Sequence, residues 1–115
     1  MNDIERLTQK IIAFRDARDW KQFHNAKDMA LSLILEATEV LEHFQWKNNQ
    51  ELEEYIKIHK DDIAEELADV LYWVLLMSHD FEIDISRAVD KKMVKNIKKY
   101  PVKKAKGRHV KYNKL

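Results

Sequence analysis

Apolar residues recur every three or four positions along most of this chain, which places them on one side of an α-helix. One such stripe predicts a helix over about residues 3–18, and another predicts a helix from about Lys27 to Trp46. The intervening residues 20–25 have no helical period and predict a loop. Asn25 or Asp28 is available there to cap the second helix. The two stripes consist of Ile4, Leu7, Ile11 and Phe14, and of Ala30, Leu33, Ile34, Ala37, Val40, Leu41 and Phe44.

The third predicted helix, from Asp61 to about His79, is apolar on nearly all sides, and Asp69 alone interrupts its apolar second half. A helix without a broad polar face belongs in the middle of a bundle or between subunits. The residues before it, 47–60, are mostly polar. They predict a connector that contains a brief helix.

A fourth helix is predicted after Asp84, a candidate N-cap, and runs to about Lys99. Tyr100 and Pro101 end it, because proline disfavours helical backbone in the residue before it. No segment shows a strand pattern. We therefore expect an all-α fold, a four-helix bundle, followed by a basic and loosely ordered tail at residues 103–115.

The composition argues against several other classes of protein. The 115 residues include one Gly, one Pro and no Cys. Hairpin-rich β folds and glycine-rich phosphate loops need more turn residues than this. Without cysteine there is no disulfide, no thiolate zinc site and no cysteine nucleophile. Neither a long apolar run nor an N-terminal signal stretch is present, so we expect a soluble, cytoplasmic protein.

The formal net charge of +1 hides two unlike segments. Residues 91–115 carry eleven Lys and Arg and no acidic side chain, whereas residues 1–90 carry all 20 acidic side chains and only ten basic ones. This separation of charge needs an explanation from chemistry or from a partner.

Two pairs of acidic residues stand at helical spacing. Glu36 and Glu39 lie three positions apart in the second helix, and Glu66 and Asp69 do so in the third, so each pair projects from one side. Such pairs are common on solvated helix faces. Here both pairs are flanked by apolar residues, and buried carboxylates cannot all stay ionised without cations. We expect these four carboxylates to hold a divalent metal.

The ligand type favours Mg²⁺, with Mn²⁺ as a possible substitute, because every donor is an oxygen. The competing di-iron site of helical bundles uses Glu-x-x-His on two helices. None of the five histidines has an acidic residue three positions before it, so the di-iron hypothesis is weak. Mg²⁺ held by carboxylates usually keeps waters and binds a substrate that carries phosphate.

The fourth helix supplies candidate phosphate ligands. Lys92 and Asn96 stand four positions apart at the edge of the apolar stripe, where a cation and an amide are suited to phosphate oxygens. Lys92 could instead extend from the core edge or pair with one carboxylate.

Aromatic residues border the polar segments and are candidates for stacking on a base: Trp20, Phe23, Trp46 and Trp73. They could equally fill the core or an interface. His24 lies in the loop beside them, where a capping or surface role is the ordinary one.

The ordered set of motifs resembles the MazG-like nucleoside triphosphate pyrophosphohydrolases, of the all-α NTP pyrophosphatase superfamily. Glu36-Ala-Thr-Glu39 followed by Glu66-Leu-Ala-Asp69 resembles the ExxE and ExxD signature of that family. Residues 14–24 and 92–101 are similar to its short, single-domain dCTP pyrophosphatase-like branch. The resemblance covers roughly residues 4–102, with its blocks in the family's order.

This resemblance implies Mg²⁺-dependent hydrolysis of a (deoxy)nucleoside triphosphate to the monophosphate and pyrophosphate, with a role in nucleotide-pool housecleaning. Residues 1–102 would form the catalytic domain, assembled as a homodimer or homotetramer with shared sites. The four carboxylates would be catalytic metal ligands. Lys92 and Asn96 would bind phosphate, and the base would be bound by Trp20, His24, Trp46 and Trp73.

Two other functions remain open from the residues alone. A helical nucleic-acid-binding protein would use the basic C-terminal segment on phosphate backbones, with structural acidic residues. An inert scaffold or antitoxin-like partner would turn over no triphosphate. No segment suggests a membrane partner.

Overall fold

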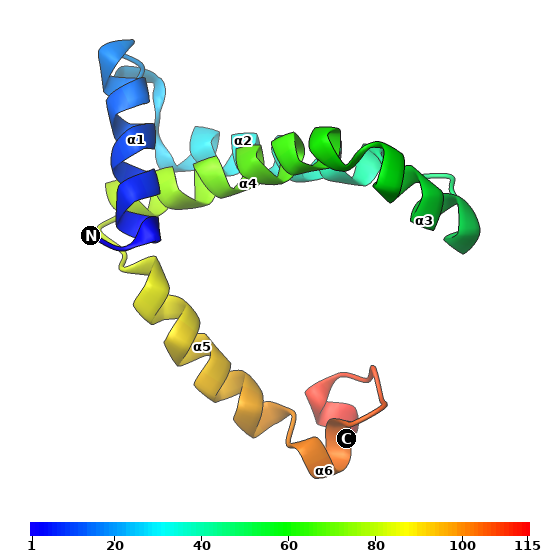
Figure 1. Cartoon of the computed structure of the whole chain (residues 1–115). Helices are drawn as coiled ribbons and strands as arrows, with labels where there is room; N and C mark the ends of the chain where they lie inside the picture. Colours follow the sequence, from blue (N-terminus) through cyan, green and yellow to red (C-terminus); the bar gives the residue numbers. More distant parts are fainter. The chain divides into compact units, whose positions relative to one another are not determined.

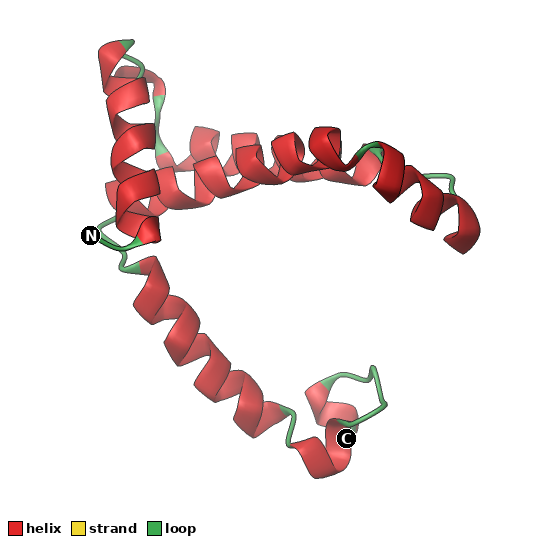
Figure 2. Ribbon diagram, viewed as in Figure 1, coloured by secondary structure: helices red, strands yellow, loops and turns green.

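Every regular element of the chain is helical, as the apolar spacing predicts (Figures 1 and 2). The computed structural model describes residues 1–115. The predicted all-α class is therefore confirmed. The elements are α1 (Asp3–Ala17), the 3₁₀ turn η1 (Lys21–Phe23), α2 (Ala26–Glu42), α3 (Asn49–Ile58), α4 (Lys60–Asp80), α5 (Ile85–Lys99), α6 (Val102–Ala105) and the 3₁₀ turn η2 (Tyr112–Lys114).

Asparagine and aspartate side chains start most of the longer helices. Asn25 caps α2 by accepting a hydrogen bond from the backbone N–H of Asp28 at 2.8 Å, which decides between the two predicted caps. Asp84 caps α5 in the same way, as predicted. Asn48 and Glu51 form a reciprocal capping box at the start of α3. Each cap satisfies a backbone donor that has no partner within the helix.

The second helix ends earlier than its apolar stripe predicts, at Glu42 rather than near Trp46. The N–H of Phe44 donates to the Leu41 carbonyl at 2.9 Å, a three-residue bond of the 3₁₀ type that tightens the chain as the α-helix ends. Trp46 has a φ of +75°, in the left-handed region that interrupts a right-handed helix. Phe44 stays half-buried in this turn, so the hydrophobic pattern continues past the true end.

By packing, the chain divides into two units, residues 1–82 and residues 83–115. In the first unit α4 packs against α1, α2 and α3, and most extensively against α2. Leu75 and Leu76 of α4 and Met29 of α2 are fully buried. The helix that is apolar on nearly all sides is thus the central one, in agreement with the prediction. None of the helices combines the length and the apolar character needed to span a membrane.

A buried ion pair joins α1 to the C-terminal end of α4. The Arg15 side chain is 1% exposed, and its Nη1 donates to Oδ2 of Asp80 at 2.6 Å. Its Nε donates to Oδ1 of Asp16 at 3.3 Å. The backbone carbonyl of Arg15 also accepts from the N–H of Trp20, so the same residue directs the loop that follows α1. Buried charges are stable when they are paired in this way.

The second unit consists of α5, α6 and η2. Pro101 precedes α6, so the predicted end of the fourth helix is confirmed. The Tyr112 ring lies edge-on to Tyr100 at 6.3 Å, and Nζ of Lys99 is 4.8 Å from the Tyr112 ring centre. These contacts give the end of the chain a defined path. The expectation of a loosely ordered tail came from its charge pattern, which does not reveal contacts between aromatic rings.

Replacing Arg15 by Met should destabilise the first unit by about 3–5 kcal/mol, because Asp80 would lose the partner of a buried ion pair. Urea unfolding followed by circular dichroism at 222 nm measures this loss. The matched control is Arg6→Met, which removes an exposed ion pair of 3.5 Å with Asp3 and should cost about 0–1 kcal/mol. Equal stability of the two variants would contradict the role assigned to Arg15.

Candidate metal and nucleotide site

Four carboxyl groups meet where α2 packs against α4. Glu36 and Glu39 come from α2, and Glu66 and Asp69 come from α4. One oxygen from each lies within 4.8 Å of one oxygen from every other. The three-residue spacing places each pair on one side of its helix, and the packing of the helices brings the two pairs together. The structure thus gathers all four predicted metal ligands.

Two of these carboxyl groups are partly withdrawn from water. Glu36 and Glu66 are half-buried, whereas Glu39 and Asp69 are exposed. The Oε2 atoms of Glu36 and Glu66 are enclosed, and no N–H or O–H group of the chain donates to them. Buried acceptors are normally satisfied, so a shared proton or a cation is needed here.

Two members of the cluster, Glu36 and Glu66, hold protons more tightly than isolated carboxyl groups do. The pKa of Glu66 is raised from 4.5 to about 7, first because Glu39 hydrogen-bonds its protonated form, then by burial and by repulsion from the neighbouring carboxylates. The pKa of Glu36 is also raised, mainly by burial and then by Glu39 and Asp69. A proton or a nearby positive charge lowers the repulsion between such carboxylates.

The donor set fits a hard divalent cation. All four groups offer oxygen, and two of the oxygens are buried without a donor. Oxygen donors of this kind suit Mg²⁺ or Mn²⁺.

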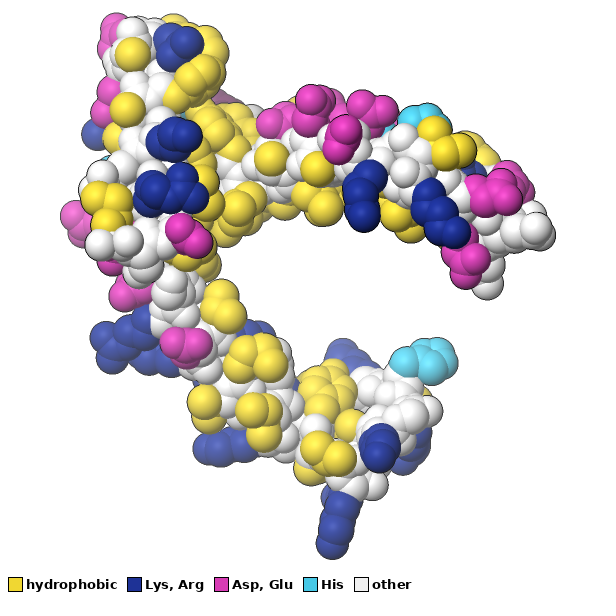
Figure 3. Space-filling view, viewed as in Figure 1, with side chains coloured by type: hydrophobic (Ala, Val, Ile, Leu, Met, Phe, Trp, Pro, Cys, Tyr) yellow, Lys and Arg dark blue, Asp and Glu magenta, His cyan; other side chains and the backbone are white.

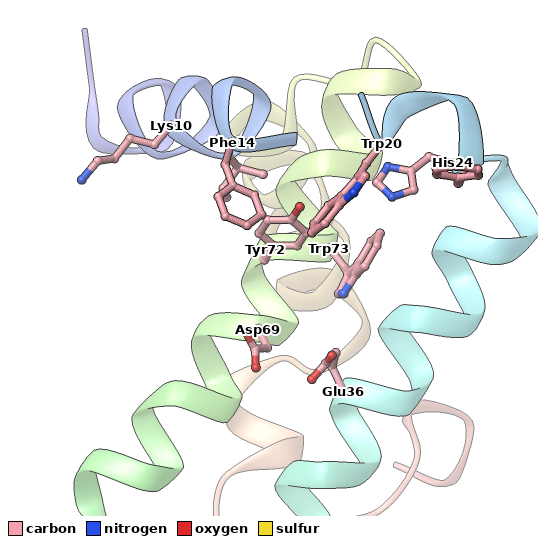
Figure 4. Close-up of a pocket in the computed structure, with 10 residues that line it drawn as sticks. Lys10, Phe14, Trp20, His24, Glu36, Asp69, Tyr72 and Trp73 are labelled. Atoms are coloured by element: carbon pink, nitrogen blue, oxygen red, sulfur yellow. The ribbon is translucent and has the colours of Figure 1, made fainter. Parts of the chain in front are cut away.

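A pocket of about 710 Å³ adjoins the cluster, and it lies wholly within the first unit. Figure 4 shows aromatic side chains at one end and the carboxylates of Glu36 and Asp69 at the other. Its volume is typical of sites for small molecules and cofactors. The residues that line it are Lys10, Ile11, Phe14, Trp20, Phe23, His24, Glu36, Asp69, Tyr72 and Trp73.

The aromatic end of the pocket is built from rings that support one another edge to face. The Phe14 ring lies 5.6 Å from Trp20 and 6.3 Å from Tyr72, and Tyr72 lies 5.2 Å from Trp73. These rings form an aromatic wall of the pocket, on which a planar ligand can pack. Both helices α1 and α4 and the loop after α1 contribute to it.

His24 lies against this wall, with its ring 5.3 Å from that of Trp73. Its Nδ1 is buried and has no hydrogen-bond partner. Burial lowers the pKa of His24, and the nearby positive charge of Arg15 lowers it further, against a smaller opposing effect of Asp80. The neutral ring can donate from one nitrogen and accept at the other.

Comparison with known proteins now decides the family. The sequence pattern of the MazG-like family matches residues 31–115. This chain belongs to the MazG-like family. The resemblance carried by its motifs is confirmed, and with it the class of enzyme, a nucleoside triphosphate pyrophosphatase.

Proteins similar to this chain agree with it in sequence and in fold. The chain is 37% identical to dCTP pyrophosphatase 1 of Rattus norvegicus and 33% identical to that of Homo sapiens, over its full length and 67% of theirs. A crystal structure of a pyrophosphatase from Archaeoglobus fulgidus is 38% identical, with a TM-score of 0.83. That similarity covers 88% of this chain and 94% of the archaeal one.

The predicted base-binding residues fall into two groups. Trp20, His24 and Trp73 line the pocket. Trp46 does not line it and is 90% exposed in the turn after α2. Its assignment to base binding stays a prediction.

The predicted phosphate ligands lie in the second unit. Lys92 and Asn96 stand one turn apart on α5, and the Asn96 side chain lies 3.9 Å from the sulfur of Met93. Asn96 is half-buried and Lys92 is exposed. Their role with phosphate stays a prediction as well.

Sequence reasoning missed part of the pocket lining. Tyr72 follows Asp69 by three positions, so the two share one side of α4, but in the sequence Tyr72 stands within the apolar run that follows Asp69. Lys10 and Phe14, four positions apart, likewise share one side of α1. The spacing was a usable signal for Tyr72. Spacing alone gave no such signal for Lys10 and Phe14, because the side of α1 that faces the pocket depends on how α1 packs on α4.

Without metal, the folded protein should become less stable as the pH rises from about 4.5 to about 7. Across that range the folded state holds the proton of Glu66, whose pKa is raised to about 7, more tightly than the unfolded state does. Stability from this group is therefore fully present below pH 4.5 and is lost as the pH passes its folded pKa.

Urea unfolding with a chelator, at a series of pH values, measures this slope in the wild type and in Glu66→Gln, which cannot titrate there. Glu65→Gln, a change at the exposed neighbouring position, is the control and should keep the wild-type slope. A Glu66→Gln slope identical to the wild-type slope would refute the assignment.

Proposed function

We propose that this MazG-like chain hydrolyses (deoxy)nucleoside triphosphates to the monophosphate and pyrophosphate with Mg²⁺, and that Mn²⁺ can replace it. The observation that carries the proposal is the position of the four-carboxylate cluster at one end of a pocket whose other end is aromatic. A triphosphate has matching ends, an anionic chain that needs cations and a planar base that stacks. The substrates proposed are canonical or modified deoxynucleotides, with a role in nucleotide-pool housecleaning.

The bond to be broken is the anhydride between the α- and β-phosphates. The oxygen of a water molecule bonds to phosphorus, the bond from that phosphorus to the bridging oxygen breaks, and the bridging oxygen leaves with the other product. One nucleoside monophosphate and one pyrophosphate result, with release of a proton. The carboxylates of the cluster are the groups in the pocket suited to orient that water and accept its proton.

Glu36, Glu39, Glu66 and Asp69 would hold the ion at this cluster. When bound, Mg²⁺ would neutralise part of the triphosphate charge and lower the pKa of a water molecule. The contribution of the carboxylate side chains is to orient their oxygens toward the ion. The Oε2 atoms of Glu36 and Glu66 are buried where α2 packs against α4.

The aromatic end is proposed to hold the base. Trp20 and Trp73 offer ring faces, and stacking on an aromatic side chain contributes about 1–3 kcal/mol per base. The neutral His24, with a buried unpaired nitrogen, can hydrogen-bond a polar edge of the base. The relatives named dCTP pyrophosphatase 1 make a pyrimidine the first base to try.

The phosphate end requires positive charge beyond the metal. We assign this role to Lys92 and Asn96 on α5, whose donors suit phosphate oxygens. Residues 1–102 carry the activity in this proposal. The lysines of residues 103–115 have no part in it.

Loss of a cluster carboxylate should abolish turnover. Glu39→Gln and Asp69→Asn keep the size of each side chain but remove its charge, so kcat should fall at least about 100-fold. Pyrophosphate release from dCTP with Mg²⁺ measures this effect, and the helical circular dichroism should stay at the wild-type level. Glu65→Gln is the matched control and should retain full turnover. Full turnover of Glu39→Gln or Asp69→Asn would rule out the proposed site.

Self-association is proposed because the first unit leaves large apolar side chains in solvent. Figure 3 shows hydrophobic side chains exposed along the α2 and α4 helices. Exposed apolar patches usually mark contacts with another protein surface. Trp46 would then be available to the pocket of a second copy. The large apolar side chains of α2 and α4 that are at least half exposed are Leu31, Ile34, Leu35, Leu41 and Leu67.

Sedimentation velocity tests this proposal directly. We expect a dimer or tetramer for the wild type at micromolar concentration, and a shift to smaller species for Leu35→Glu, which places a charge in the apolar face. Lys57→Glu, on the exposed side of α3, is the control and should sediment like the wild type. A wild-type protein that is monomeric and fully active would refute it.

A further inference from the structure

A histidine outside the carboxylate cluster faces one of its members. His43 follows the last residue of α2 and is 15% exposed. Its Nε2 lies 4.0 Å from Oε1 of Glu66, which is too long for a direct hydrogen bond but close enough for an electrostatic contact. Glu66 therefore has different neighbours at its two oxygens. Oε1 faces the imidazole, and Oε2 is buried without a donor.

The other nitrogen of the same ring is held by a tyrosine from α3. The distance between Nδ1 of His43 and the hydroxyl oxygen of Tyr55 is 2.5 Å. If the hydroxyl donates, Nδ1 is an acceptor and the neutral ring carries its proton on Nε2. That tautomer directs an N–H at the Glu66 carboxylate, whereas the opposite tautomer would direct a lone pair at it. The charge of Glu66 favours the first arrangement.

Tyr55 is itself fixed from several sides. The His59 ring stacks on it at 4.1 Å, and Nζ of Lys47 lies 4.3 Å from its ring centre. The Phe44 ring meets it edge-on at 6.3 Å. A ring with three such neighbours gives its hydroxyl a definite position. A series of contacts thus leads from Tyr55 on α3 to His43, and from His43 to Oε1 of Glu66.

We propose that His43, oriented by the Tyr55 hydroxyl, is a positioning residue that holds Oε1 of Glu66 and thereby presents its Oε2 to the divalent metal. The inference rests on the proposed function, since it assumes that the carboxylate cluster binds a metal. Partners of this kind commonly orient a metal ligand and raise metal affinity by about 10–100-fold. The sequence motifs of the cluster do not include either residue. Tyr55 lies on α3, the brief helix that the sequence predicts only as part of a connector.

The test measures metal affinity as well as turnover. Metal-free full-length protein is titrated with MnCl₂ in a calorimeter, and the Mg²⁺ dependence of dCTP hydrolysis is recorded in parallel. His43→Leu should weaken Mn²⁺ binding and raise the half-saturating Mg²⁺ concentration by about 10-fold. The kcat at saturating Mg²⁺ should change by less than about 3-fold, because His43 touches neither substrate nor the reacting atoms in this proposal.

Two conservative variants separate positioning from folding. His43→Gln keeps an N–H donor and should recover most of the affinity that His43→Leu loses. Tyr55→Phe keeps the ring between His59 and Lys47 but frees the imidazole, so it should cause an intermediate loss. His59→Phe keeps a stacked ring away from the cluster and is the control, with wild-type Mn²⁺ affinity expected. Thermal unfolding of each variant is followed by circular dichroism.

Each outcome decides a different statement. Unchanged Mn²⁺ affinity in a folded His43→Leu protein would overturn the inference and leave the metal site standing. Equal losses in His43→Gln and His43→Leu, together with equally lowered thermal stability, would show that His43 is only structural. The proposed function itself would be overturned if the wild-type protein bound no Mn²⁺, or if Glu39→Gln bound Mn²⁺ as well as the wild type does.

Discussion

Four carboxyl groups within 4.8 Å of one another repel, and the packing of α2 on α4 leaves them little freedom to separate. The metal-free chain relieves this repulsion by keeping a proton: the hydrogen bond with Glu39, burial and the neighbouring carboxylates together raise the pKa of Glu66 to about 7. A divalent cation would relieve the repulsion as well and would also satisfy the two buried Oε2 atoms. The repulsion that lowers the stability of the metal-free fold would therefore favour cation binding at the cluster.

The rest of the first unit places a base-sized pocket beside that cluster. The Arg15 to Asp80 ion pair fixes α1 on α4, and the backbone of Arg15 directs the loop that carries Trp20. The aromatic wall therefore has a fixed distance from the carboxylates, on elements that pack on α4. In the proposed function, a ligand with an anionic chain and a planar base would contact the carboxylates at one end of the pocket and the aromatic rings at the other.

Helix positions and the carboxylate cluster followed from the sequence because both depend on local spacing. The i, i+3 carboxylate pairs needed only that two amphipathic helices pack along their apolar stripes, and α2 and α4 do so. The end of α2 was not predictable, since Phe44 extends the apolar pattern beyond the last helical residue. Nor were the contacts of Arg15 with Asp80 and of His43 with Tyr55, which join residues far apart in the chain or in different elements. Such pairings depend on tertiary packing rather than on periodicity.

The central claim is that the carboxylate cluster and the aromatic pocket act on one triphosphate. Phosphorus NMR of the products formed from dCTP tests it most directly, with and without Mg²⁺. Equal amounts of dCMP and pyrophosphate, formed only when Mg²⁺ is present and not by Asp69→Asn, are the predicted result. Orthophosphate as the sole product, or an unchanged rate with a chelator in place of Mg²⁺, would contradict it.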